Sequence, residues 1–345
     1  MPGTARAGSS LAVLAVLALA ACSAPTTTGP SATDRPSGEI TVYNAQHESM
    51  TQAWVDAFTA ETGITVTMRQ GKDTEMSNQL IQEGSASPAD VFITENSPAM
   101  TQVENAGLLA GVDQEIIDQV PADFRPSSNK WTGVAARSTV FVYNPALLSE
   151  ADLPQSLLDL ADPEWKGRWG ASPTGADFQA IVSAVLETVG EAETARWLTG
   201  VQENVAVYQG NGAVLKAVNA GEIAGGVIYH YYYYGDQAKT GENSGNVKQH
   251  YFRNQDPGAF VSVSGGGVLK SSDNPAAAQA FLTFITGKTG QTLLATGTDF
   301  EYPVGSGVAA HEGLVPLDEL QAPSVDPARL NGEKVFELMV SAGLL

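Results

Sequence analysis

The sequence predicts a two-domain α/β protein whose halves are joined by crossing strands. Strand and helix patterns alternate three times within residues 39–96, which is typical of a parallel sheet with helices on its faces. A second αβ pattern begins near residue 174, and two β-rich runs are placed to carry the chain from one half to the other. We therefore expect a hinged clamshell with polar residues at the strand ends that face its cleft.

Periodic apolar residues and glycine stops define the elements of the first half. Helical spacing predicts one helix over Met50–Phe58, closed by Gly63, and another over Met76–Ile81, ended by Gly84. The expected strands are Ile40–Tyr43, Ile64–Met68 and Val91–Ile93.

The second half repeats the pattern after a crossing strand at Thr139–Tyr143. A strong helix is expected over Phe178–Val189, and Thr174 with Asp177 resembles a capping box at its start. The other expected elements are a strand at Ala224–Ile228, a return crossing at Val261–Val263 and a helix that begins at Asn274–Pro275 and ends at Gly287. The first domain is expected to comprise residues 39–136 and 265–300, and the second residues 137–264 and 301–345.

The N-terminus resembles a bacterial lipoprotein signal. Arg6 precedes the apolar run Leu11–Ala21, which is too short to span a bilayer and is typical of a secretory signal. The run leads into Cys22, the only cysteine of the chain. We expect residues 1–22 to be a signal peptide ending at a lipidated Cys22, and residues 23–38, rich in Ser, Thr and Pro, to be a flexible linker.

The composition disfavours several classes of function. The chain has 18 Lys and Arg against 38 Asp and Glu, and its formal charge of −20 argues against nucleic acid and anionic membrane surfaces as partners. Membrane attachment is expected only through the lipid. The sequence contains no Gly-x-Ser-x-Gly elbow, no metallohydrolase His pair and no recognisable Ser–His–Asp set, so we do not expect an enzyme.

The most unusual stretch is the run Val227–Gly235. Tyr229 and His230 are followed by four consecutive tyrosines, Tyr231 to Tyr234. Successive side chains point in different directions in a strand or a helix, so some of these hydroxyls must face a cleft or water. Either the rings form an aromatic wall for a sugar or a peptide, or neighbouring phenols converge on a hard cation.

Two other polar residues lie just past predicted strand ends. His47 follows the first strand, and Glu95 follows the third. In open α/β sheets, ligands bind outside the carboxyl ends of the strands. His47 and Glu95 are therefore independent candidates for a site.

Six short motifs extend this pattern along the chain: Val42–His47, Pro88–Glu95, Trp165–Gly167, Tyr229–Tyr232, Asn254–Ala259 and Glu301–Pro303. They resemble bacterial ferric-iron-binding proteins, the extracytoplasmic substrate-binding components of iron(III) ABC importers. The resemblance covers nearly all of residues 39–345. It implies a type II periplasmic-binding-protein fold, and a monomer that captures Fe³⁺ and delivers it to an ABC permease and its ATPase.

The resemblance implies metal ligands from both halves of the chain. His47 and Glu95 match the family's imidazole and carboxylate ligands, Tyr231 and Tyr232 match its phenolate pair, and Tyr229 is a further candidate ligand. Fe³⁺ is a hard cation that selects anionic oxygens. Two phenolates and one carboxylate would balance its three charges. The two remaining sites of an octahedron would go to a small anion and a water.

The resemblance also implies a site for that anion, such as phosphate or carbonate. The matching positions are Thr174, Gly175 and Ala176 at a helix N-terminus, with Asn211 and Arg137. Three departures from the family leave the choice of anion open: Tyr229 in place of asparagine, Asn96 in place of glutamine, and Asp177, which adds negative charge.

The remaining aromatic and imidazole groups have simpler expected roles. Tyr233 and Tyr234 are assigned to packing, and His230, His250 and His311 to the surface or to contacts behind the ligands. The alternative function is a binding protein of the same fold for another cargo, such as a phosphonate or a polyamine. A cluster of adjacent phenols is not typical of sugar-binding sites. The high negative charge of the chain is compatible with a polyamine as the ligand.

Overall fold

The computed structural model describes residues 36–305 and 307–345, and residues 36–345 form one compact unit. The predicted signal peptide, Cys22 and all but the last residues of the predicted linker lie outside the described residues. Within the described ranges, no helix is long and apolar enough to cross a bilayer.

The first lobe is built on three parallel strands. β1 (Glu39–Asn44) pairs on one side with β2 (Thr65–Gln70) and on the other with β3 (Val91–Ile93), which confirms the predicted parallel sheet. Its helices are α1 (Glu48–Thr62), α2 (Asp73–Glu83), α3 (Ser97–Asn105), α4 (Gln114–Gln119), α9 (Pro275–Thr286) and α10 (Lys288–Thr296). α1 ends where predicted, because Gly63 adopts a left-handed φ of 77° that suits glycine.

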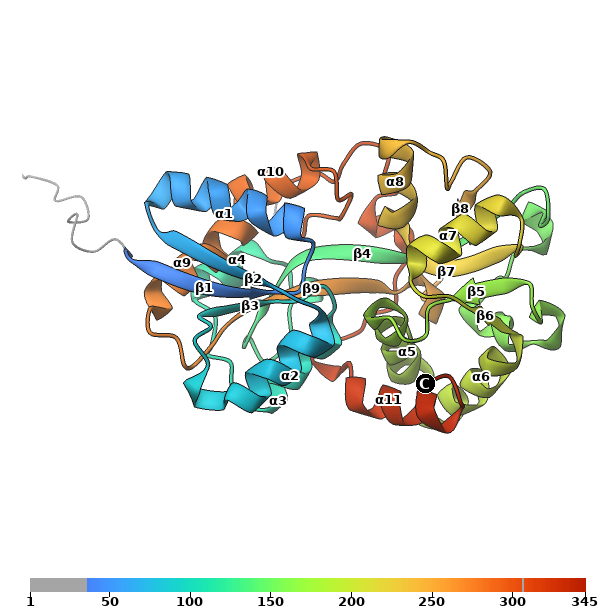
Figure 1. Ribbon diagram of the computed structural model, residues 1–345, viewed down its shortest axis with the longest axis horizontal. Coiled ribbons are helices and arrows are strands. Elements are labelled where there is room, and N and C mark those ends of the chain that lie inside the picture. The colour runs from blue at the N-terminus through green and yellow to red at the C-terminus, as the bar shows by residue number, and fades with distance from the viewer. Residues whose placement is uncertain (1–35, 306) are drawn as a thin grey trace, which may run out of the picture. The chain divides into compact units, whose positions relative to one another are not determined.

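Two antiparallel strands run from the first lobe to the second (Figure 1). β4 (Thr132–Tyr143) pairs with β9 (Val261–Val268) up to Ser138, and from Thr139 onward it pairs with β7 (Gly225–Tyr229). The strand order is β2-β1-β3-β9-β4-β7-β5-β6. Both predicted crossings are confirmed. β4 begins earlier than predicted, since the glycine and alanines of its first half have little β-propensity of their own.

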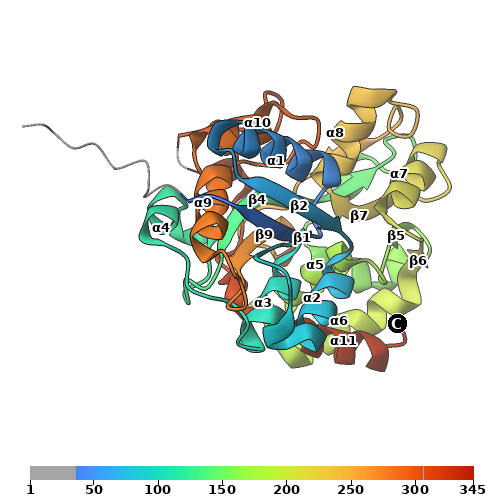
Figure 2. The same cartoon turned by 60° about the vertical axis from the view of Figure 1, so that its left-hand side comes forward.

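The second lobe repeats the layered arrangement. β5 (Trp169–Ala171) lies between β7 and β6 (Val205–Val207) in parallel register, and β8 (Lys248–His250) pairs with β4. Its helices are α5 (Ala176–Val189), α6 (Glu191–Asn204), α7 (Asn211–Ala220), α8 (His230–Lys239) and α11 (Gly332–Ser341). Figures 1 and 2 show α7 and α8 on one side of this sheet and α5, α6 and α11 on the other.

Short 3₁₀ helices punctuate the connections. They lie at Gly84–Ala86, Ala122–Phe124, Glu150–Asp152, Leu157–Ala161, Pro163–Trp165, Pro257–Ala259, Leu317–Leu320 and Pro327–Arg329.

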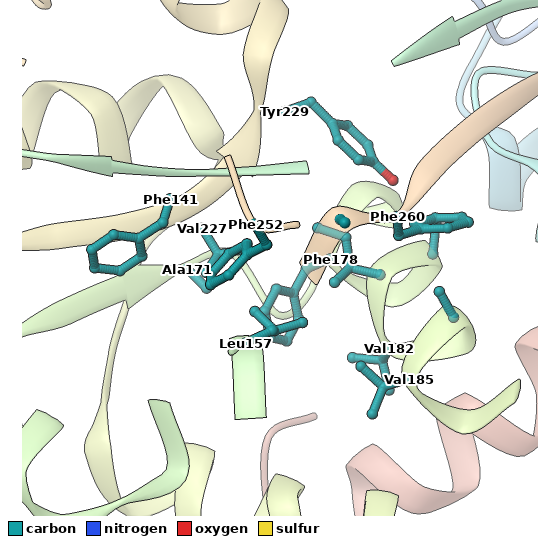
Figure 3. Packing of buried hydrophobic residues seen from close by; sticks show 14 of the residues in the cluster. Phe141, Leu157, Ala171, Phe178, Val182, Val185, Val227, Tyr229, Phe252 and Phe260 are labelled. Atoms are coloured by element: carbon teal, nitrogen blue, oxygen red, sulfur yellow. The ribbon is translucent and has the colours of Figure 1, made fainter. Parts of the chain in front are cut away.

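Each lobe has its own apolar core. In the first lobe, Trp54 and Phe58 of α1 are buried in one cluster with Phe281 of α9. In the second lobe, Phe178 of α5 belongs to a large buried cluster, and Tyr229 lies at the edge of the part drawn in Figure 3. Each fully buried aromatic contributes about 1.5–3 kcal/mol from apolar area alone. These cores fix the strands whose ends carry the polar residues.

One predicted local motif is wrong. α5 begins at Ala176, and Gly175 is its N-cap with no side-chain cap hydrogen bond, so Thr174 and Asp177 form no capping box. The reason is that the Asp177 carboxylate accepts hydrogen bonds from Asn96 of the first lobe and from Tyr232 of α8 instead of from the helix start.

The predicted domain boundaries stay a prediction. β4 changes its partner strand between Ser138 and Thr139, close to the expected boundary at residue 137. A third segment also joins the lobes, because Ala136 and Tyr302 exchange two backbone hydrogen bonds of 3.0 and 2.8 Å.

Candidate metal centre

The tyrosine pair enters the cleft from the start of α8. β7 ends at Tyr229, and the chain turns directly into α8, so Tyr231 and Tyr232 lie in the first helical turn. Their rings stack with centroids 4.4 Å apart. The Tyr231 hydroxyl donates to Glu95 Oε1 at 2.6 Å, and the Tyr232 hydroxyl donates to Asp177 Oδ2 at 3.1 Å. Two adjacent phenol oxygens therefore face carboxylates from both lobes.

His47 and Glu95 complete the set from the first lobe. His47 Nε2 lies 3.5 Å from Glu95 Oε1, and its ring makes an edge contact with Tyr231 at 4.9 Å. Asp73, at the start of α2, accepts hydrogen bonds of 2.9 Å from the backbone N–H groups of Glu95 and Asn96. The structure thus brings together His47, Glu95, Tyr231 and Tyr232, the four residues that the sequence predicted to lie close to one another.

The phenol oxygens are the other candidate metal donors in the cleft. Within residues 36–305 and 307–345, no three His, Cys, Asp or Glu side chains are placed to hold a metal ion together. The His–carboxylate pair alone is therefore an incomplete ligand set, and the Tyr231 hydroxyl brings a further oxygen to within 2.6 Å of Glu95 Oε1.

Asp177 makes contacts in the cleft that the sequence did not predict. Its carboxylate accepts hydrogen bonds from Asn211 Nδ2 at 2.7 Å, from Asn96 Nδ2 at 3.0 Å and from the Tyr232 hydroxyl. It lies in the first turn of α5, at the helix N-terminus that was expected to hold a free anion. The sequence signal was present, because Asp177 is an acidic departure beside the proposed pocket.

The predicted anion residues separate into two groups. Thr174, Gly175, Ala176 and Asn211 line a cavity of 940 Å³ between the lobes, together with His47, Glu95 and Tyr232. Arg137 lies elsewhere: it is fully buried behind Glu95, where its guanidinium pairs with Glu301 at 2.7 Å and donates to the Glu95 carbonyl. The guanidinium is therefore committed to interior partners and does not line this cavity.

Tyr229 lies beside the tyrosine pair, with its ring centroid 6.3 Å from that of Tyr231. It is fully buried, and its hydroxyl donates to Asn96 Oδ1 at 3.3 Å and to the Asp177 carbonyl at 3.4 Å. Burial raises the pKa of the Tyr229 phenol well above its usual value, and the charge of Asp177 raises it further. This geometry supports the position of Asp177 more directly than it supports Tyr229 as a ligand.

The other tyrosines and histidines lie around this set. Tyr233 packs against the core beside α7, and the Tyr234 hydroxyl donates to the Gly313 carbonyl at 3.1 Å. His230 is fully buried behind the tyrosine pair, where burial lowers its pKa to about 3. His250 is partly buried in β8, and His311 lies against Phe300.

The protonation states follow from burial and charge. Burial raises the pKa of Tyr231 and of Tyr232, and the charges of Asp177 and Glu95 raise both further. Burial opposes the charged form of His47, but hydrogen bonds to Asp299 and Glu95 raise its pKa to about 10. Both phenols are thus neutral without a metal, and a bound cation must displace their protons.

Comparison with known proteins decides the family. The bacterial extracellular solute-binding proteins match residues 86–329. The chain belongs to this family. An Fe(3+)-binding periplasmic protein of Serratia marcescens is 62% identical to this chain over 306 residues, which cover 89% of this chain and 90% of the relative. A major ferric iron-binding protein of Neisseria gonorrhoeae is 38% identical over 309 residues, covering 89% and 93%.

Solved structures agree with the sequence relatives. The structure of iron-bound HitA from Pseudomonas aeruginosa is similar to this one, with a TM-score of 0.82 and 39% sequence identity. The match covers 89% of this chain and 99% of HitA. The predicted type II periplasmic-binding-protein fold and the resemblance to ferric-iron-binding proteins are both confirmed. The chain is an extracytoplasmic solute-binding protein and not an enzyme.

Asp177 predicts a pH-dependent stability of the metal-free protein. Burial and the charge of Glu95 raise its pKa to about 7, whereas the unfolded chain loses this proton near pH 4. The stabilisation that the bound proton supplies is complete below about pH 4 and is lost as the pH rises through about 7. We expect Asp177→Asn to remove this component, so that its Tm rises by several degrees relative to the wild type between pH 4 and pH 8.

The matched control is Asp56→Asn, on the exposed side of α1. It should follow the wild-type curve. If Asp177→Asn also follows that curve, Asp177 is already ionised in the metal-free cleft, which would contradict the prediction.

Proposed function

We propose that this chain captures ferric iron in the cleft between its lobes and delivers it to an ABC permease and its ATPase. The observation that carries the proposal is the convergence of Tyr231 and Tyr232 on the carboxylates of Glu95 and Asp177, with His47 beside them. The Serratia marcescens relative, which is named for binding Fe(3+), supports the same ligand.

The donor set suits a small trivalent cation. Carboxylate and phenolate oxygens are hard anionic donors of the type that Fe³⁺ prefers. As the lobes close, the metal would take the place of the protons on Tyr231, Tyr232 and Asp177, and His47 would give up a proton to offer a neutral nitrogen. With Glu95 and Asp177 ionised and both phenols deprotonated, the four negative charges exceed the three positive charges of the ion.

Asp177 is proposed as the group that fills the expected anion position. Its carboxylate already holds the hydrogen bond from Asn211 that a bound phosphate or carbonate was expected to receive. It also carries its own negative charge at the N-terminus of α5, where the helix dipole favours one. A free anion is then unnecessary for a complete set of donors.

The rest of the chain would serve delivery. Lipidated Cys22 would tether a monomer to the membrane through the linker, and the crossing strands would let the lobes close on the metal.

Cys22→Ala should bind iron normally but leave the membrane fraction for the medium. Retention of this variant in membranes would contradict the anchor.

Tyr232→Phe tests the metal site. The change removes one anionic oxygen and keeps the ring, so we expect loss of the visible phenolate-to-iron band and an affinity lower by several orders of magnitude. The measurement is titration of the metal-free protein with ferric citrate, followed by absorbance. Tyr233→Phe is the matched control on the same helix, because Tyr233 packs against the core. Equal iron binding by the two variants would contradict the assignment of Tyr232 as a metal ligand. In the same titration, displacement of iron by spermidine would favour a polyamine as the cargo.

The role of Asp177 has a separate test. Wild-type protein loaded from ferric nitrilotriacetate in buffer free of phosphate and carbonate should develop the full visible band. Asp177→Ala should develop it only when phosphate is added, because the vacated position can then take a free anion. A wild-type band that requires phosphate would show that Asp177 does not replace the anion.

A further inference from the structure

The segment Asp299–Glu301 lies directly behind the ligand set at the third connection between the lobes. Asp299 Oδ1 is 3.4 Å from His47 Nδ1 and accepts a 2.9 Å hydrogen bond from the Ser49 hydroxyl. The Phe300 carbonyl is 2.8 Å from His230 Nε2. Glu301 pairs with Arg137, which donates to the Glu95 carbonyl. Three consecutive residues therefore touch a ligand or the group that supports one.

The two nitrogens of His47 are divided between the cleft and this segment. Nε2 faces Glu95 Oε1 at 3.5 Å, while Nδ1 faces Asp299. A histidine that binds metal through one nitrogen usually donates its other N–H to a carboxylate or a carbonyl, which fixes the tautomer and the ring orientation. Asp299 is placed to accept that hydrogen bond.

Glu301 is the competing acceptor, because its Oε1 lies 3.6 Å from His47 Nδ1. Its other oxygen is held by Arg137, so its charge is already compensated in the interior. Among the described residues, Oε1 has no hydrogen-bond partner of its own. Asp299 has the shorter contact and is the more exposed carboxylate, with 17% of its side chain accessible. We therefore assign the orienting contact to Asp299.

The backbone of the segment explains how one stretch reaches both lobes. Phe300 has a φ of 54°, in the left-handed region that costs energy for a residue other than glycine. Its ring is held between Tyr234, at 6.0 Å, and His311, at 4.7 Å. The Asp299 side chain meets His47 from this segment, and the Phe300 carbonyl meets His230.

His230 relays the second contact to the tyrosine pair. Its Nδ1 accepts a 3.2 Å hydrogen bond from the Ser138 N–H of β4, so its Nε2–H is free to donate to Phe300. The residue next in the chain is Tyr231. The start of α8 is thereby attached to the crossing strand and to the third connection at once.

We propose that Asp299–Glu301 orients the metal ligands, with Asp299 as the positioning residue for His47 and the Phe300 carbonyl, through His230, as the support for Tyr231. The proposal rests on the proposed function of the site. It goes further by assigning the geometry of the ligands to a segment that lies outside the ligand set.

The test compares Asp299→Ala and Asp299→Asn with Glu48→Gln. Glu48 is an exposed carboxylate that lines the same 650 Å³ cavity as Asp299, so its variant controls for lost negative charge. In metal-free protein, the ring N–H signal of His47 in ¹⁵N-edited NMR should be protected in the wild type and in Glu48→Gln. It should exchange rapidly in Asp299→Ala.

The iron titration supplies the second readout. Asp299→Ala should bind iron about 10–100-fold more weakly, the usual cost of removing such a partner, while its visible band stays in place because both phenolates remain. Asp299→Asn should recover most of the affinity, since its amide oxygen can still accept from Nδ1. Because Asp299 is partly exposed, both variants should melt close to the wild type.

The outcomes separate the two proposals. If the wild type shows no iron band, the proposed function fails, and the NMR comparison in metal-free protein still decides whether Asp299 orients His47. If the wild type binds iron, but Asp299→Ala matches Glu48→Gln in affinity and in the His47 signal, the positioning role is wrong.

Discussion

The cleft depends on one buried ion pair, between Arg137 of β4 and Glu301. Both side chains are fully buried with a nitrogen–oxygen distance of 2.7 Å. Loss of either partner from such a pair costs about 3–5 kcal/mol, because the remaining charge stays buried and unpaired. Arg137 also donates to Ser264 of β9 and to the Glu95 carbonyl. One guanidinium therefore holds together two crossing strands and the end of β3, and it sets where Glu95 can lie.

The cleft built on this framework holds the carboxyl groups of Asp73 and Asp177 close to that of Glu95, and this raises their pKa values. Burial and the charge of Glu95 raise the pKa of Asp73 to about 8, and they act on Asp177 in the same direction. Hydrogen bonds from Asn96 to both carboxyl groups tie the lobes to each other through this pair. In the metal-free cleft, burial favours the protonated form of these two carboxyl groups, and amide hydrogen bonds stabilise them further.

Much of this could be predicted from the sequence, because the responsible signals are local. Apolar spacing and glycine stops located α1 and α9, and polar residues after strand ends located His47 and Glu95. The long reach of β4 and the absence of a cap at Thr174 could not be predicted, since both depend on tertiary partners. Asp299 and Glu301 were also missed as supports, because their roles arise from contacts with residues more than 150 positions away in the chain.

The division of donors between the lobes has a kinetic consequence. Glu95 and His47 belong to the first lobe, whereas Asp177, Tyr231 and Tyr232 belong to the second. With ionised side chains, the second lobe alone matches the three charges of a ferric ion, and the first lobe supplies one more. Capture would then proceed in two steps. The ion would first bind the donors of the second lobe, and the first lobe would then close and add Glu95 and His47. Unloading would run in reverse, so the residence time of the ion would be set by how long the first lobe stays engaged.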